Sequence, residues 1–255
     1  MNNLLKEAGF ENLNDIPPLC KRLYIDVGTA IDAPNSASWL LMDPEAYVIG
    51  IEPHQGNIDI LTKGRDPNFH LNYLCLGEDS VKRNGYKLGE IGGRFCMLYC
   101  AIDDVEEPTT APFYHTDSRN TGCSSLLKPT KKLGLDVVNL VDTPIVSLKM
   151  IMDHLPKNRF EVITFLKTDT QGKDLDVVKS LGDYINKVIL LQMEVFTNNQ
   201  YRNEQKKEDI EEFLAKYKFQ FLSKGTYDWM LAKGNITPSE YSKYVPKNFE
   251  FIKGT

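Results

Sequence analysis

Two short apolar segments, the first ending in Asp-x-Gly and the second in a glutamate before a proline, constrain the fold of this chain more than any other feature. Residues 23–27 are followed by Gly28, and residues 48–52 are followed by Pro53. The chain between them is long enough for one helix, which is the pattern of a parallel strand–helix–strand unit. Because ligands of an open α/β sheet bind outside the carboxyl ends of its strands, these two ends predict a shared binding site.

The acids at the two strand ends indicate an adenosine-containing cofactor. Glu52 can accept hydrogen bonds from both ribose hydroxyls. A dinucleotide needs a glycine-rich first turn around its diphosphate, whereas Gly28 is followed by Ala30 and Ala33 at the later positions. S-adenosylmethionine carries no phosphate, and Asp26 is expected to orient its ammonium group directly or through water. The predicted cofactor residues here are Asp26, Gly28, Thr29, Ala30, Glu52, Pro53 and His54.

Structural interpretations of the same residues stay open. Asp26 can satisfy N–H groups of a tight turn after a buried strand. Glu52 can be an exposed acid in a turn that Pro53 enforces, and His54 can face solvent instead of bordering the adenosine.

A third strand end is expected to bind the adenine ring. Residues 94–102 form an apolar run that continues to Asp103, where Ala101, Ile102 and Asp103 can offer backbone N–H groups and a carboxylate. Residues 69–76 form a similar run, and one of the two is predicted to belong to an insertion around 69–95.

Two later strand ends carry the residues expected to act on the substrate. The apolar run 161–166 leads to Lys167 and Asp169, and the run 187–195 contains Glu194 near its end. Asp169 is predicted to accept a proton from a hydroxyl group, and Lys167 to stabilise developing negative charge. Asp169 and Glu194 together can hold a divalent cation, although no histidine joins them at a clear spacing. The alternative for Asp169 is a helix cap.

The small-residue segment 122–125 is predicted to close over the cofactor or the substrate, with an ordinary surface turn as the alternative. Contacts to the substrate are expected from His115, Ser124 and Glu194.

Composition narrows the class of protein. The formal net charge is −5, which favours no nucleic-acid partner, and no apolar run is long enough for a membrane span. The five cysteines include no close pair and the first residues lack the pattern of a signal peptide, so a cytoplasmic protein with free thiols is expected. Residues 1–21 are interpreted as a lead-in to a single domain over 22–255.

The last third of the sequence predicts how the sheet ends. A helix over 204–217, with Asn203 at its N-cap, is followed by strands over 219–223 and 227–232. The expected fold is therefore an α/β domain with a mostly parallel sheet, helices on both faces and an antiparallel edge strand.

The order of these motifs resembles the FkbM-type S-adenosylmethionine-dependent methyltransferases. The resemblance spans about residues 22–232, and its motifs lie at residues 24–28, 50–53, 101–103, 124–126, 146–148, 166–172 and 193–194. It implies a seven-stranded class I methyltransferase sheet and O-methylation of a hydroxyl, often on a sugar. It also implies cofactor roles for Asp26, Gly28 and Glu52, and active-site roles for Lys167 and Asp169. Where the family has Asp-x-Glu-Gly, this chain has Gln171 in place of the glutamate.

The sequence thus favours an O-methyltransferase whose acceptor is a small molecule or glycan. One alternative is an NAD-linked sugar oxidoreductase of Rossmann type, although no Tyr-x-x-x-Lys pair is evident. The other is a methyltransferase fold that serves as a binding module without turnover.

Overall fold

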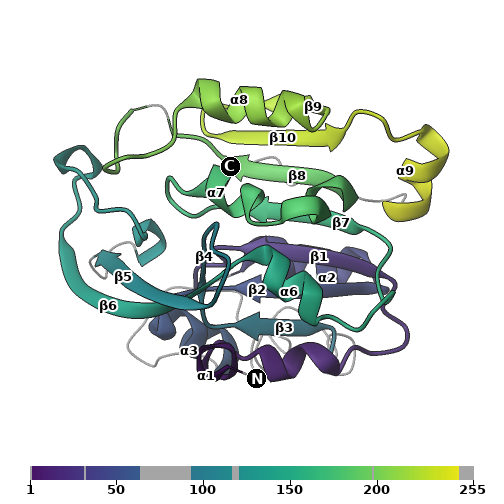
Figure 1. The fold of residues 1–255 in the computed structure, drawn as a ribbon, viewed down its shortest axis with the longest axis horizontal. Helices are drawn as coiled ribbons and strands as arrows, with labels where there is room; N and C mark the ends of the chain where they lie inside the picture. The colour runs from purple at the N-terminus through teal and green to yellow at the C-terminus, as the bar shows by residue number, and fades with distance from the viewer. Residues whose placement is uncertain (1, 32, 64–92, 117–120, 197, 247–255) are drawn as a thin grey trace.

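A central β-sheet organises the molecule. The computed structural model describes residues 2–31, 33–63, 93–116, 121–196 and 198–246 (Figure 1). Within these residues, seven strands form one sheet in the order β3-β2-β1-β7-β8-β10-β9. The strands are β1 Arg22–Val27, β2 Ala46–Ile51, β3 Phe95–Leu98, β7 Ile163–Thr168, β8 Val188–Glu194, β9 Phe219–Lys224 and β10 Asp228–Lys233.

The strand order creates a switch point between β1 and β7. From β1 the chain moves outward through β2 to β3, and it later returns to the other side of β1 to form β7 and β8. All neighbouring pairs from β3 to β8 are parallel. The carboxyl ends on either side of such a point diverge, which leaves room for a ligand there.

Helices cover both faces of the sheet, which explains why its inner strands are apolar throughout. One core contains Ile25 with apolar residues of α6 (Leu148–His154), α7 (Asp174–Lys179) and α8 (Lys207–Lys216). The other contains Tyr24 with Trp39 of α2 (Pro34–Met42). Figure 1 shows α6 and α7 in front of the sheet and α2 behind it. None of the helices in the described ranges is both long and apolar enough to cross a membrane.

The sheet ends differently from the predicted arrangement. The antiparallel strand is β10, and it lies between β8 and β9 instead of at the edge. The hairpin that follows α8 places its second strand against β8, so β9 becomes the edge and runs in the direction of β8. Beyond it, α9 (Pro238–Tyr244) begins with a capping box from Thr237 and Glu240, which the sequence analysis did not identify.

A second, three-stranded sheet stands beside the cavity described below. It has the order β4-β6-β5, formed by Ala101–Ile102, Val137–Val146 and Thr109–Thr116. The single strand predicted over 94–102 is therefore wrong, because β3 ends at Leu98 and Ala101–Ile102 pairs with the end of β6. The competing run 69–76, and with it most of the predicted insertion, lies outside the described residues.

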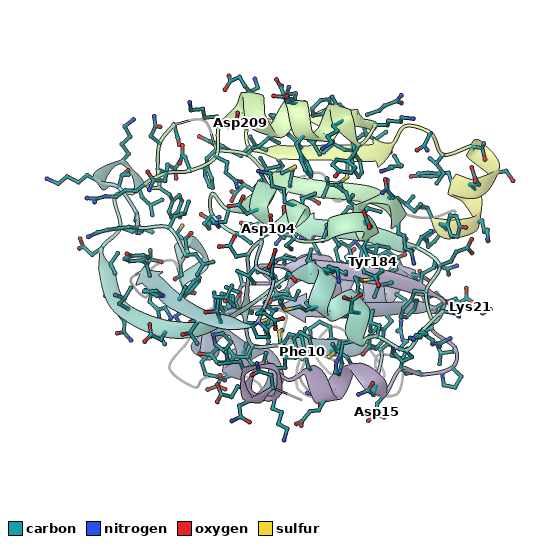
Figure 2. The ribbon with its side chains drawn as sticks, in the orientation of Figure 1. Phe10, Asp15, Lys21, Asp104, Tyr184 and Asp209 are labelled. Carbon is teal, nitrogen blue, oxygen red and sulfur yellow. The ribbon has the colours of Figure 1, made fainter. Side chains whose placement is uncertain are left out.

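The lead-in packs against the domain. It forms α1 (Asn3–Glu7) and a 3₁₀ helix over Phe10–Asn14, whose Phe10 and Leu13 are fully buried in the larger core. Phe10 points into the body of the molecule, whereas Asp15 and Lys21 lie at its periphery (Figure 2).

Helix α3 (Gln55–Lys63) follows the end of β2. Helix α8 begins later than predicted, at Lys207. Glu204 accepts hydrogen bonds from the N–H groups of Asn199 and Tyr201, which closes a loop before the helix. Asn203 adopts a left-handed φ of 60° and is not the cap.

Candidate functional site

A cavity of about 420 Å³ lies at the carboxyl ends of the parallel strands. Its wall includes residues that end or follow β1, β2, β7 and β8, together with parts of the second sheet and the segment 121–126. This volume falls within the range of roughly 300–1,000 Å³ typical of small-molecule sites. The strand ends that the sequence singled out therefore do meet at one hollow.

Glu52 connects the ends of β1 and β2. Its Oε2 accepts a hydrogen bond from Ala30 N at 2.8 Å, and its Oε1 accepts one from His54 N at 2.8 Å. Burial raises the pKa of Glu52 to about 7, against the effect of these two donors and of a hydrogen bond from the Asn57 side chain. A carboxylate has about four acceptor positions, so Glu52 retains capacity for a ligand in the cavity that it lines.

The turn after β1 requires a glycine. Gly28 has a φ of +79°, and a Cβ at this position would lie 1.9 Å from the carbonyl oxygen of Asp169. Gly28 and Ala30 line the cavity, whereas Thr29 is almost completely buried away from it. The turn therefore brings backbone, and not bulky side chains, to this part of the wall.

Asp26 lies behind the cavity wall, on the α2 side of the sheet. Its Oδ2 accepts hydrogen bonds from the backbone N of Ser36 at 3.1 Å and from Ser36 Oγ at 2.6 Å. Its Oδ1 lies 3.4 Å from Lys167 Nζ. Asp26 is fully buried and is not among the residues that line the cavity. This placement corresponds to the structural alternative, in which Asp26 satisfies N–H groups near its own strand.

At the third strand end, Ala101 and Ile102 line the cavity, as does Pro53 after β2. Asp103 does not, because its N–H donates to Val146 O at 3.1 Å and its Oδ1 pairs with Lys173 Nζ at 2.8 Å. Its N–H is therefore already engaged and does not face the cavity as the sequence analysis expected.

His54 and His115 contact each other. Their ring centroids are 4.1 Å apart with an interplanar angle of 28°. Burial and the neighbouring His115 lower the pKa of His54 to about 4, and burial lowers that of His115, so both rings are neutral at pH 7. Neither ring is among the cavity-lining residues. Asn57, one turn into α3, lines the cavity instead, and the sequence analysis missed it.

Lys167 ties β1 to β7 from behind the cavity. Its Nζ donates to Gly28 O at 2.6 Å and pairs with Asp26 and with Asp169 Oδ2, the latter at 3.6 Å. Burial alone would lower the pKa of Lys167, but Asp169 and Asp26 outweigh it and raise it. Lys167 therefore stays charged, and it acts on the cavity through Asp169 because its own side chain does not line the wall.

Asp169 and Glu194 form a coupled pair of acids in the cavity wall. Their strands β7 and β8 are parallel neighbours. Burial would raise the pKa of Asp169, but Lys167 and hydrogen bonds from Glu194 and Gln171 outweigh it and lower the value. Burial and the negative charge of Asp169 raise the pKa of Glu194 well above its ordinary range. The two pKa values are shifted in opposite directions, so Asp169 is the more readily ionised member of the pair and Glu194 the one that holds a proton more tightly.

The amide of Gln171 lies between the two acids. Its Nε2 donates to Asp169 Oδ1 at 2.7 Å and to Glu194 Oε2 at 2.6 Å. Tyr201 Oη donates to Gln171 Oε1 at 2.8 Å and lies 2.9 Å from Cys123 O. No group of three or more His, Cys, Asp or Glu side chains suited to a metal ion occurs among the described residues.

The segment 121–126 packs against this network. Ser124 is mostly buried and lines the cavity, where its Oγ accepts a hydrogen bond from Thr116 N at 3.1 Å. Ser125 Oγ donates to Gln171 O at 2.9 Å. Two aromatic residues that the sequence analysis missed, Phe196 and Tyr227, line another part of the wall with their ring centroids 5.8 Å apart.

These features define a Rossmann-like α/β protein with a cavity at the switch point of its sheet. A family model, the methyltransferase FkbM domain, matches residues 26–221. The chain therefore belongs to the FkbM methyltransferase family, which confirms the resemblance inferred from the motifs. No curated protein and no solved structure matches the chain.

Proposed function

We propose that this methyltransferase uses S-adenosylmethionine to methylate a hydroxyl group of a sugar or glycan. The observation that carries the proposal is that one cavity contains both Glu52 and the Asp169–Glu194 pair. At about 4.8 Å per strand, the β2 end lies roughly 10 Å from the β7 end and roughly 14 Å from the β8 end. This span suits a nucleoside with a short amino-acid arm, followed by the group that it modifies.

The residues present fit such a cofactor. Glu52 has acceptor positions left for ribose hydroxyls, and Pro53, Ala101 and Ile102 offer an apolar wall for adenine. The backbone around Gly28 can approach the amino-acid arm closely. When bound, S-adenosylmethionine supplies a methyl group on a positively charged sulfur, and the acids of the wall favour that charge.

The start of helix α2, which follows the turn after β1, argues against a dinucleotide cofactor. A diphosphate needs free N–H groups at the start of the helix after β1. Here Pro34 is the first residue of α2 and has no N–H, and the N–H of Ser36 already donates to Asp26. The carboxylate of Asp169, whose pKa is lowered, would also repel two phosphates.

The chain's own contribution is to orient the acceptor hydroxyl and to take its proton. Asp169 is the ionised member of the pair, so it can accept a hydrogen bond from the hydroxyl. A weakly basic carboxylate can accept this proton, because the hydroxyl proton becomes strongly acidic as its oxygen gains the methyl group. Phe196 and Tyr227 offer aromatic faces for the ring carbons of a sugar, and Gln200 offers an amide for its hydroxyls.

Product analysis tests this proposal. The purified protein is incubated with S-adenosylmethionine and a panel of neutral sugars and oligosaccharides, and S-adenosylhomocysteine and methylated sugar are measured by mass spectrometry. We expect both products with at least one acceptor and only background levels with Asp169→Asn. Reduction of NAD by a sugar, without S-adenosylhomocysteine, would instead support the oxidoreductase. Cofactor binding without turnover on any acceptor would support the binding module.

A further inference from the structure

We propose that Gln171 is a positioning residue, which holds the carboxyl groups of Asp169 and Glu194 together through two hydrogen bonds from its amide nitrogen. The inference adds a positioning residue to the proposed methyl transfer. Only the expected effects on kcat and KM rest on that proposed function. The physical part of the inference, the protonation of two carboxyl groups, can be measured without substrate or cofactor.

The geometry requires the amide to face the acids with its nitrogen. Nε2 lies 2.7 Å from Asp169 Oδ1 and 2.6 Å from Glu194 Oε2, so both of its hydrogens are engaged. In the opposite orientation Oε1 would face a carboxyl oxygen of each acid, and the ionised carboxylate of Asp169 can only accept hydrogen bonds. At the other end of the amide, Tyr201 Oη donates to Oε1 at 2.8 Å, which is consistent with this orientation.

The backbone at this position indicates that the side chain is needed. Gln171 has a φ of 59°, in the left-handed region that disfavours a residue with a side chain, and Gly172 follows with a φ of 100°. Glycine would be the relaxed choice at residue 171. Ser125 Oγ holds the turn by donating to Gln171 O at 2.9 Å and to Thr170 O at 3.3 Å. A disfavoured conformation that surrounding bonds maintain beside a cavity is evidence for a role of the group it presents.

The network also joins the acids to the wall of the cavity. Tyr201 is fully buried, and its hydroxyl lies 2.9 Å from Cys123 O in the segment 121–123. Cys123 itself lines the cavity beside Ser124. The amide between the two acids is thus connected through Tyr201 to this segment.

A neutral donor between two acids has a defined electrostatic effect. Hydrogen bonds to an ionised carboxylate favour its charged form, so Gln171 lowers the pKa of both acids. Without the amide, both proton-dissociation steps of the pair should move to higher pH. We expect a shift of about one pKa unit in each step, which is a tenfold change in proton affinity.

The test uses three variants and a direct readout of the carboxyl groups. Gln171→Met keeps the length and the strained backbone but removes the amide, Gln171→Gly removes the amide and relieves the strain, and Tyr201→Phe removes only the hydroxyl. Each is labelled with ¹³C at its Asp and Glu carboxyl carbons and titrated by NMR, with Asp169→Asn and Glu194→Gln used to assign the signals.

We expect both steps to move up by about one unit in Gln171→Met and in Gln171→Gly, and by less in Tyr201→Phe. Gln171→Gly should unfold at higher urea concentration than Gln171→Met and yet show the same shift, which a merely structural role would not produce. The pH dependence of kcat should move with the carboxyl titration, while the KM for S-adenosylmethionine stays within about twofold.

Unchanged titration of Asp169 and Glu194 in Gln171→Met would overturn the inference, whether or not the protein transfers methyl groups. Shifted titration in a protein without methyl transfer would leave the positioning role intact and refute the proposed function alone.

Discussion

At Gly28, one added methyl group would test how closely the turn after β1 packs against Asp169 beside the cavity. In Gly28→Ala the new Cβ would lie 1.9 Å from Asp169 O, at a φ of +79°. A side chain in the left-handed region costs about 1–2 kcal/mol, and forcing apart a packed contact costs about 1–3 kcal/mol. The free energy of unfolding should therefore fall by about 2–5 kcal/mol, a large share of the 5–15 kcal/mol typical of a domain.

Gly134→Ala provides the matched control. Gly134 has a similar φ of +71°, but an added Cβ would have no atom within 4 Å. Only the conformational cost remains there, so we expect a loss of about 1 kcal/mol. Urea unfolding followed by circular dichroism measures the loss of unfolding free energy in both variants. The comparison holds when the m-value, the dependence of that free energy on urea concentration, is unchanged. Equal losses for the two variants would refute the close approach of Gly28 to Asp169.

Three further predictions concern the cavity. Asp169→Asn should lower kcat by about 10²- to 10⁴-fold in the methyl-transfer assay, because the proton acceptor is lost. Affinity for S-adenosylmethionine, measured by calorimetry, should weaken about tenfold from pH 8 to pH 6. Glu52 has a pKa of about 7, so its ionised fraction falls over this interval and with it the form that favours a cationic ligand. Phe196→Ala should raise the KM for the acceptor about 2- to 10-fold, since an aromatic contact is removed.

Each of these has a control that can contradict it. Asp169→Asn should bind S-adenosylmethionine nearly as well as the wild type, so a loss of binding would assign it another role. Glu52→Gln should remove the pH dependence of affinity, and persistence of that dependence would assign the titration to another group. Phe196→Ala should leave cofactor affinity unchanged, so a weaker cofactor complex would place the aromatic pair at the wrong end of the cavity.

The sequence predicted the parallel part of the sheet well because its strands carry continuous apolar runs that local patterning reveals. It did not predict β5 and β6, because much of this hairpin is exposed and its alternation is weak. The break between β3 and β4 was also hidden, since Phe95–Leu98 and Ala101–Ile102 look like one run. Only the pairing of Ala101–Ile102 with β6, a contact across the chain, separates them.

In the candidate site too, local sequence patterns did not reveal contacts between distant parts of the chain. Glu52 and Asp169 were found because strand ends can be located in a sequence. The alternation of side chains along β1 places Asp26 on the same face of the strand as Tyr24. The sequence does not show which helix covers that face, because this depends on the course of the crossover connections. The bridge from Tyr201 to Gln171 joins residues thirty positions apart, and no local pattern marks it.

Isothermal titration calorimetry with S-adenosylmethionine and with NAD, at pH 8 and equal concentrations, measures the central claim most directly. We predict saturable heat at one site per chain with S-adenosylmethionine, loss of that heat in Glu52→Ala, and no binding of NAD. Binding of NAD alone, or binding of S-adenosylmethionine that Glu52→Ala leaves unchanged, would contradict the account.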